Sequence, residues 1–233
     1  MKSGCLLEIS VESLQAAMAA ERGGAHRIEL CSNLSEGGTT PSPDLLRGVR
    51  SRVRLPIVSM IRPRGGSFVY SSAEFEAMER DIGIAKDCRM DGVVLGLLDR
   101  RGFIDVERTR HLVIVARPLP VTFHRAFDEC ADLQTALEDV IQTGATRLLT
   151  SGGKPTAPES LAVIGELVKT ARNRIVVQPG SGVHAGNVEA LVRRTRVREV
   201  HAALSSVVPH PDENLPAFEK AVCELATTLA ACR

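Results

Sequence analysis

The chain has 233 residues and carries 29 basic and 28 acidic side chains, so its formal net charge at pH 7 is only +1. These charges are mixed along the sequence, which argues against nucleic acid or an anionic membrane surface as a partner. No apolar run approaches the roughly 20 residues of a membrane helix, and the first residues lack the layout of a signal peptide. We therefore expect a cytoplasmic protein.

Short runs rich in β-branched residues alternate with longer amphipathic segments along the whole chain. Such strict alternation predicts parallel strands joined by crossover helices. In chain order, each predicted strand and the predicted helix after it occupy residues 5–10 and 11–22, 26–31 and 42–52, 56–61 and 72–88, 91–96 and 105–116, 119–124 and 132–143, 146–151 and 157–171, 174–178 and 184–194, and 197–203 and 214–231.

An internal repeat narrows the predicted fold. Residues Gly24–Leu30, at the second strand, are echoed by Gly144–Thr150 at the sixth. A repeat of about 60 residues that holds two strand–helix units and occurs four times suits a closed eightfold barrel. We therefore predict an α/β protein whose residues 1–233 form a TIM (β/α)8 barrel as a single domain. An open, doubly wound sheet is the alternative, because alternation alone does not fix the order of the strands.

Ionisable and polar side chains cluster near the carboxyl ends of the predicted strands, where such a barrel carries its active site. Side chains alternate along a strand, which places Glu29 on the same face as Cys31. Because buried charge is costly, a mixed cluster of this size is hard to explain by stability alone. We expect one polar mouth formed by Glu8, Glu29, Arg62, Arg64, His124, Arg125, Asp128, Gln178 and His201.

Each of these residues also has a purely structural interpretation. Glu8 and Glu29 could pair with Arg62, Arg64 or Arg125 in a buried ionic lattice that tightens the barrel. His124 could be a core histidine that donates a hydrogen bond to a carbonyl group. The sequence leaves these alternatives open beside that of a functional mouth.

Two glycine loops after the sixth and seventh strands indicate anion binding. The segments 150–154 and 178–182 offer backbone N–H groups, hydroxyls and a lysine near the start of a helix. The alternative is that the glycines only turn the chain from strand to helix. The residues expected to contact an anion here are Thr150, Ser151, Gly152, Gln178, Gly180 and Gly182.

The cysteines bear on metal binding. All six are scattered without a Cys-x-x-Cys pair, which favours reduced thiols over disulfides or structural zinc. Cu(I) prefers thiolates, thioethers and imidazoles. Cys31 lies at a strand end where it could bind Cu(I), with His124 or His201 as companions across the barrel.

In order along the chain, these motifs resemble the copper homeostasis protein family CutC over roughly residues 5–204. The resemblance implies a cytosolic TIM barrel, copper homeostasis or Cu(I) binding, and self-association as a dimer or tetramer. Family members often carry a cysteine where this chain has Ser10, so only Cys31 is carried over as a Cu(I) ligand. The segments that carry the resemblance are 7–9, 24–31, 36–42, 61–66, 120–128, 149–152 and 199–201.

The residues themselves favour a different function. Two carboxylates, several arginines and glycine loops at one mouth are typical of an enzyme or binder for a small anionic metabolite, such as a phosphorylated one. In this hypothesis Arg62, Arg64, Ser151 and the 180–182 loop hold the anion. Proton transfer falls to Glu8, Glu29 or His124, and the sequence does not assign acid and base. A barrel that serves only as a partner scaffold is a third alternative.

Overall fold

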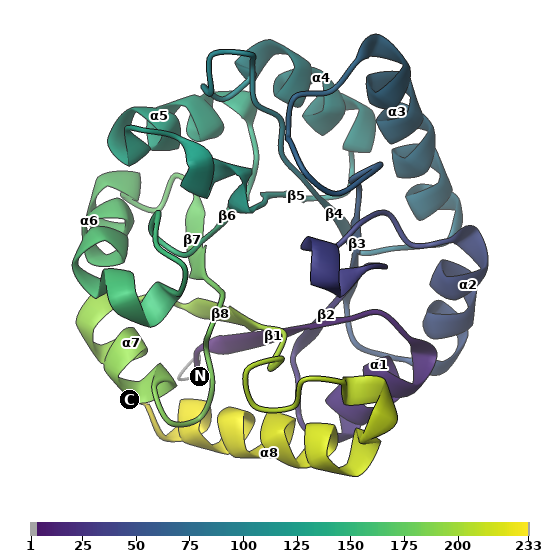
Figure 1. Cartoon of the computed structure of the whole chain (residues 1–233), viewed down its shortest axis with the longest axis vertical. Coiled ribbons are helices and arrows are strands. Elements are labelled where there is room, and N and C mark those ends of the chain that lie inside the picture. The colour runs from purple at the N-terminus through teal and green to yellow at the C-terminus, as the bar shows by residue number, and fades with distance from the viewer. Residues whose placement is uncertain (1–3, 233) are drawn as a thin grey trace.

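The computed structural model describes residues 4–232, in which eight parallel strands form a ring. The strands are β1 (Leu6–Val11), β2 (Arg27–Leu30), β3 (Ile57–Met60), β4 (Gly92–Leu95), β5 (Val121–Phe123), β6 (Arg147–Thr150), β7 (Val176–Pro179) and β8 (Glu199–Ala202). Their hydrogen-bonded order is β7-β6-β5-β4-β3-β2-β1-β8, and β7 lies beside β8 where the ring closes (Figure 1). The predicted TIM barrel is confirmed, and the open sheet is not formed.

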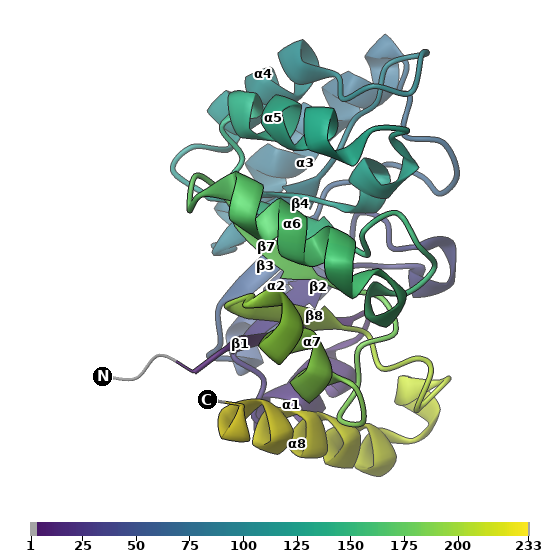
Figure 2. The ribbon, with the colours of Figure 1, turned by 90° about the vertical axis from the view of Figure 1, so that its left-hand side faces the viewer.

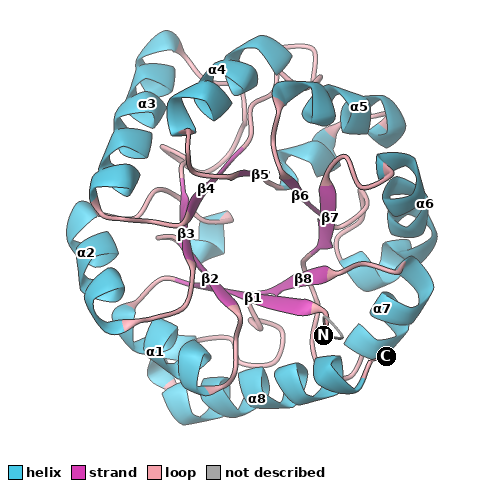
Figure 3. Ribbon diagram, turned by 180° about the vertical axis from the view of Figure 1, so that it is seen from behind, coloured by secondary structure: helices cyan, strands magenta, loops and turns pink. Residues whose placement is uncertain are grey.

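An α-helix follows each strand and packs on the outside of the ring (Figure 3). These helices are α1 (Leu14–Arg22), α2 (Pro43–Arg52), α3 (Ser72–Asp87), α4 (Val106–Ala116), α5 (Leu133–Thr143), α6 (Leu161–Ala171), α7 (Val188–Thr195) and α8 (Leu215–Ala231). Short 3-10 helices that the sequence patterns did not predict lie in the loops. They are η1 (Leu34–Glu36), η2 (Arg125–Glu129), η3 (Ala157–Ser160) and η4 (Pro211–Glu213).

The loops that follow the strands gather on one side of the barrel, at the right in Figure 2. Because all strands are parallel, this side holds their carboxyl ends, and Figure 1 looks into it. Leu34 of η1 packs there on a small apolar cluster inside the ring. No helix within residues 4–232 is long and apolar enough to cross a membrane.

A buried ionic lattice crosses the interior of the barrel below this mouth. Arg27 forms ion pairs with Glu8 and with Glu199, the latter at 2.6 Å, and Arg147 also pairs with Glu199 at 2.6 Å. The structural interpretation of Glu8 therefore holds, but its cation is Arg27 rather than Arg62, Arg64 or Arg125. Side chains two residues apart share a strand face, so Arg27 points inward like Glu29.

Helix α3 begins with a capping box at Ser71. The Ser71 hydroxyl accepts a hydrogen bond from Glu74 N at 3.3 Å, and the Glu74 carboxylate accepts one from Ser71 N at 2.7 Å. Replacing Ser71 by alanine leaves the first-turn N–H groups without this acceptor, and we expect the free energy of unfolding to fall by about 1 kcal/mol. Urea unfolding monitored by circular dichroism measures the loss.

Ser51 provides the matched control for this prediction. It lies in the last turn of α2, is exposed, and donates only to the Gly48 carbonyl oxygen. Alanine is favourable inside a helix, so Ser51→Ala should change stability by less than about 0.5 kcal/mol. Equal effects of the two substitutions would show that the capping box does not stabilise α3.

Candidate functional site

The carboxyl ends of the strands surround a cavity of about 520 Å³. This volume is large enough for a small metabolite. The residues of the predicted mouth that line it are Glu29, Arg62, His124, Arg125, Asp128, Gly182 and His201. The predicted residues that lie outside its lining are Glu8, Cys31, Arg64, Thr150, Ser151, Gly152, Gln178 and Gly180.

Arg64 does not belong to the lining of the cavity. Its guanidinium pairs with the Glu74 carboxylate at 2.5 Å and donates to the carbonyl oxygens of Ser67 and Val69. These contacts tie the loop after β3 to the start of α3. Arg64 therefore belongs to the support of the loop and not to an anion site.

The glycine loop after β6 binds a carboxylate of the protein itself. Ser151 N donates to Asp128 at 2.9 Å, and Thr150 Oγ1 donates to it at 2.5 Å. Arg125 Nε adds a third contact to Asp128 at 2.9 Å, and Gly152 N donates to Thr150 Oγ1 at 2.8 Å. Because these donors are already used, the loop cannot offer them to a bound anion as the sequence analysis expected.

The end of β7 and the loop after it support the mouth in two ways. Gln178 is fully buried and donates to Glu8 Oε1 at 3.0 Å. A Cβ atom on Gly180 would lie 3.2 Å from the ring of His201 and 2.6 Å from Leu149, so only glycine lets the backbone approach this closely. Gln178 and Gly180 thus position other side chains, whereas Gly182 lines the cavity itself.

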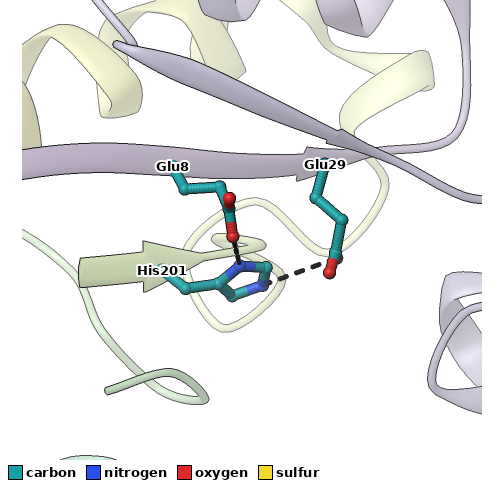
Figure 4. A group of neighbouring side chains, drawn as sticks. All are labelled: Glu8, Glu29 and His201. Atoms are coloured by element: carbon teal, nitrogen blue, oxygen red, sulfur yellow. Dashed lines mark hydrogen bonds and ion pairs between the residues drawn. The ribbon is translucent and has the colours of Figure 1, made fainter. Parts of the chain in front are cut away.

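Glu8, His201 and Glu29 form one buried cluster (Figure 4), of which His201 and Glu29 line the cavity. His201 Nδ1 lies 2.8 Å from Glu8 Oε1, and His201 Nε2 lies 3.8 Å from Glu29 Oε2. The imidazole is therefore oriented by one carboxylate and faces another. Such a carboxylate–histidine pair is the usual way to fix the tautomer of a histidine that exchanges protons.

The two carboxyl groups differ in their protonation. Burial disfavours ionisation of Glu8, but the hydrogen bond with His201 and the Arg27 guanidinium outweigh it and lower the pKa of Glu8 to about 2. Burial raises the pKa of Glu29, and the charges of His201 and Arg27 lower it too little to offset the loss of water around the carboxyl group. Burial alone would lower the pKa of His201, but the carboxylates of Glu29 and Glu8 raise it. Groups whose pKa values are moved in this way can transfer protons near neutral pH.

His124 is held neutral with a defined tautomer. Its side chain is buried, and Nδ1 accepts a hydrogen bond from Ala126 N at 3.2 Å, so the ring proton is on Nε2. Burial and the nearby Arg62 guanidinium lower the pKa of His124 to about 3. A Cβ atom on Gly96 would lie 2.5 Å from His124 Nδ1, so Gly96 leaves the room that the ring occupies.

Arg62 is fixed by its terminal nitrogens. Nη1 donates to the carbonyl oxygens of Glu36 and Gly38 at 2.8 and 3.0 Å, and Nη2 donates to that of Gly66 at 3.0 Å. The guanidinium stacks over the Phe68 ring at 4.7 Å from its centroid, and the His124 ring packs on the same phenyl group at 4.9 Å. Phe68, for which the sequence held no signal, thus joins Arg62 to His124 in one wall.

Three of the residues that line the cavity each carry a buried polar atom with no hydrogen-bond partner among the residues described. These atoms are Glu29 Oε1, Arg62 Nε and His124 Nε2, that is, one acceptor and two donors. Leaving a buried polar group unpaired costs about 1–3 kcal/mol. Three such atoms around one cavity are the arrangement expected of a binding site.

Cys31 does not fit a Cu(I) site in this arrangement. Its Sγ lies 3.5 Å from Ser10 Oγ and 3.6 Å from the Val11 carbonyl oxygen, in an apolar cluster that includes Met60. Burial and the Glu29 carboxylate raise the pKa of the thiol, which disfavours the thiolate that Cu(I) prefers. The Met60 thioether is a soft neighbour, but the second thiol expected of a thiolate pair is replaced by Ser10.

The Glu8, Glu29 and His201 cluster is the one group within residues 4–232 whose three ligand atoms converge, within 4.8 Å of one another. Its donor set is two oxygens and one nitrogen, which is unsuited to Cu(I). Glu8 is also already bound to Arg27, Gln178 and His201. The cluster therefore does not fit a Cu(I) site, and we derive no metal chemistry from it.

The fold and the cavity define a TIM barrel with a cavity lined by charged residues at the carboxyl ends of its strands. The chain belongs to the CutC family, whose family model matches residues 5–206. This confirms the resemblance seen in the sequence motifs.

Several proteins of that family are similar over most of the chain. The human copper homeostasis protein cutC homolog is 48% identical over 204 residues, which cover 88% of this chain and 75% of that protein. A CutC family protein from Chromobacterium violaceum is 48% identical over 198 residues, or 85% of this chain and 80% of the other. The crystal structure of CutC from Streptococcus agalactiae matches with a TM-score of 0.81 at 34% identity, covering 85% of this chain and 98% of that one.

Proposed function

We propose that this protein binds, and acts by proton transfer on, a small anionic metabolite in the mouth of its barrel. The observation that carries the proposal is the set of buried unpaired atoms on Glu29, Arg62 and His124 around one cavity. A bound metabolite with both donor and acceptor oxygens would satisfy all three. Glu29 and His201 are the groups that we assign to proton transfer, and Glu8 orients His201.

The charges around the cavity favour an anion. Arg62 is buried in its wall, and Arg125 and Lys154 lie nearer the opening. Four acidic residues also line the cavity, and Glu36 and Glu129 among them are exposed to solvent, where their charge is screened. Asp128 is paired with Arg125, and burial raises the pKa of Glu29 and so disfavours its charged form. Arg62 and Lys154 are the cations of the lining that remain to attract an anion.

Copper homeostasis is the role named for the human relative, and it remains a prediction for this chain. A Cu(I) site at Cys31 is not part of our proposal. The residues around that thiol disfavour a thiolate, and the thiol lies outside the lining of the cavity. Self-association, which the family resemblance implies, is likewise a prediction that an experiment on the purified protein has to test.

A thermal shift screen tests the proposed function. Phosphorylated and carboxylated metabolites should raise the melting temperature, whereas their uncharged parent compounds should not. A ligand present at about 100 times its Kd stabilises the folded state by about 2.7 kcal/mol, which for a domain of this size is a shift of roughly 5–10 °C.

Two lysine variants locate the bound anion. Lys154→Met removes a cation from the lining of the cavity and should reduce the shift. Lys169→Met changes an exposed lysine on α6 that pairs with Glu166 outside this cavity, and should leave the shift unchanged. If no anion shifts the melting temperature, or the neutral parents shift it equally, the proposed function is wrong.

A further inference from the structure

We infer that the substrate is a carbonyl compound and that this site removes a proton from the carbon atom next to the carbonyl group. The inference rests on the proposed function and adds to it the class of substrate and of reaction. It follows from the kinds of atoms that are left unpaired, namely two fixed N–H donors and one carboxylate oxygen.

The first donor is His124, which is suited to polarise a carbonyl oxygen. His124 lines the cavity, and because Ala126 N occupies Nδ1, Nε2–H is the only polar atom of the ring that is free to donate to a ligand. A neutral imidazole whose Nδ1 is occupied in this way does not accept a proton from a substrate. It can donate a hydrogen bond to an oxygen that gains negative charge during the reaction, which is a known role of a histidine kept neutral by its surroundings.

The second donor is Arg62. Its three hydrogen bonds to carbonyl oxygens and its packing on Phe68 hold the guanidinium in place, and Nε–H has no acceptor among the residues described. His124 packs on the same Phe68 ring, so the two donors belong to one rigid wall. Fixed donors of this kind stabilise developing charge without having to reorganise.

The base is Glu29. Ser10 Oγ donates to Glu29 Oε2 at 2.7 Å and anchors the carboxylate, while Oε1 stays unpaired on the wall of the cavity. Burial favours the protonated form of this group and so makes the carboxylate a stronger base than one in water. A carboxylate held by one oxygen presents the other to a substrate C–H bond.

These groups complete a balanced proton transfer. Glu29 Oε1 takes the proton from the carbon next to the carbonyl group, and the C–H bond breaks. The electron pair of that bond forms a carbon–carbon double bond, and the π electrons of the carbonyl group move onto its oxygen, which His124 Nε2–H and Arg62 Nε–H stabilise. Return of the proton from Glu29 to the same carbon re-forms the C–H bond and the carbonyl group, so no oxidant or reductant is consumed.

His201 connects Glu29 to a second proton site. Its Nε2 faces Glu29 Oε2 at 3.8 Å, and its Nδ1 is bound by the Glu8 carboxylate at 2.8 Å. A proton taken by Glu29 can therefore be exchanged through His201 before it returns to the substrate. Glu8 does not line the cavity and acts as a positioning residue for the imidazole.

Proton exchange with heavy water tests the inference directly. The protein is incubated in D2O with four probes, which are dihydroxyacetone phosphate, glyceraldehyde 3-phosphate, ribulose 5-phosphate and fructose 6-phosphate. Proton NMR follows the loss of the signal from the carbon next to the carbonyl group. We expect at least one probe to exchange 10-fold or more above the rate in buffer, and Glu29→Gln to reduce the enzyme's rate by at least 100-fold.

Two His124 variants separate hydrogen-bond donation from acid–base catalysis. His124→Gln keeps a neutral N–H donor of similar reach and should retain the rate within about 10-fold. His124→Leu removes the donor and should lower the rate by about 10²–10³-fold. If glutamine and leucine abolish exchange equally, His124 does not act as a neutral donor, and the inferred mechanism fails.

The same four probes are used in the thermal shift assay, so the two hypotheses can fail separately. A probe that raises the melting temperature without any exchange would leave the proposed binding function standing and overturn the carbonyl reaction. Probes that neither shift the melting temperature nor exchange would overturn both. The melting temperature of each variant without a ligand shows that a lost rate is not caused by unfolding.

Discussion

Replacing Arg27 by methionine is expected to lower the free energy of unfolding by about 3–5 kcal/mol, the usual cost of removing one partner from a buried ion pair. The side chains of Arg27 and Glu8 are 7% and 1% exposed. Methionine fills a similar volume but leaves the Glu8 carboxylate inside the barrel without its cation. His201 lies beside Glu8 and can take up a proton, which partly compensates the charge of Glu8. This compensation is the reason that the loss could be as small as about 3 kcal/mol. Urea unfolding at neutral pH measures the change.

Two further variants show whether the unpaired charge of Glu8 causes the loss of stability in Arg27→Met. Arg47→Met breaks an ion pair with Asp44 whose side chains are 64% and 96% exposed, and it should cost less than about 1 kcal/mol. Adding Glu8→Gln to Arg27→Met removes the unpaired charge and should recover part of the lost stability. A double variant no more stable than Arg27→Met would indicate that packing, not the unpaired carboxylate, dominates the loss.

Acidification from about pH 7.5 to about pH 5 is expected to destabilise the wild type by about 2 kcal/mol more than it destabilises His124→Gln. The pKa of His124 falls from an ordinary value of 6.5 to about 3 in the folded protein. Below pH 6.5 the unfolded chain therefore binds a proton at His124 that the folded protein refuses. Each pH unit in this window costs about 1.4 kcal/mol, so this contribution to stability is present above pH 6.5 and is lost as the pH falls toward 3.

Comparing how the free energy of unfolding changes with pH in the wild type and in His124→Gln separates the effect of His124 from that of the other titrating groups. The raised pKa of His201 acts in the opposite direction, because its protonation favours the folded protein as the pH falls, but it contributes equally to both proteins. His111→Gln is the matched control, since the His111 side chain is 54% exposed and lies outside the barrel on α4. A wild type and a His124→Gln variant with the same pH dependence would contradict the neutral state of His124.

The order and type of the main elements could be predicted from sequence because they depend on short-range patterns. Buried parallel strands require apolar runs, and helices on a barrel require an apolar stripe, so the alternation along the chain was sufficient to predict a TIM barrel. The shared face of Glu29 and Cys31 followed from the alternation of side chains along a strand. The 3-10 helices were missed because a single turn is too short to produce a periodic signal.

The partners of the charged residues were decided only by tertiary structure. The loop after β6 and Arg64 were both predicted to bind an anion. In the structure, the loop instead donates hydrogen bonds to Asp128, and Arg64 pairs with Glu74. Arg27 was overlooked, although it lies two residues before Glu29 on the same face. The sequence by itself determined the barrel and the polar character of its mouth. Which atoms remain unpaired there depends on hydrogen bonds between residues far apart in the chain, and only the folded structure brings those residues together.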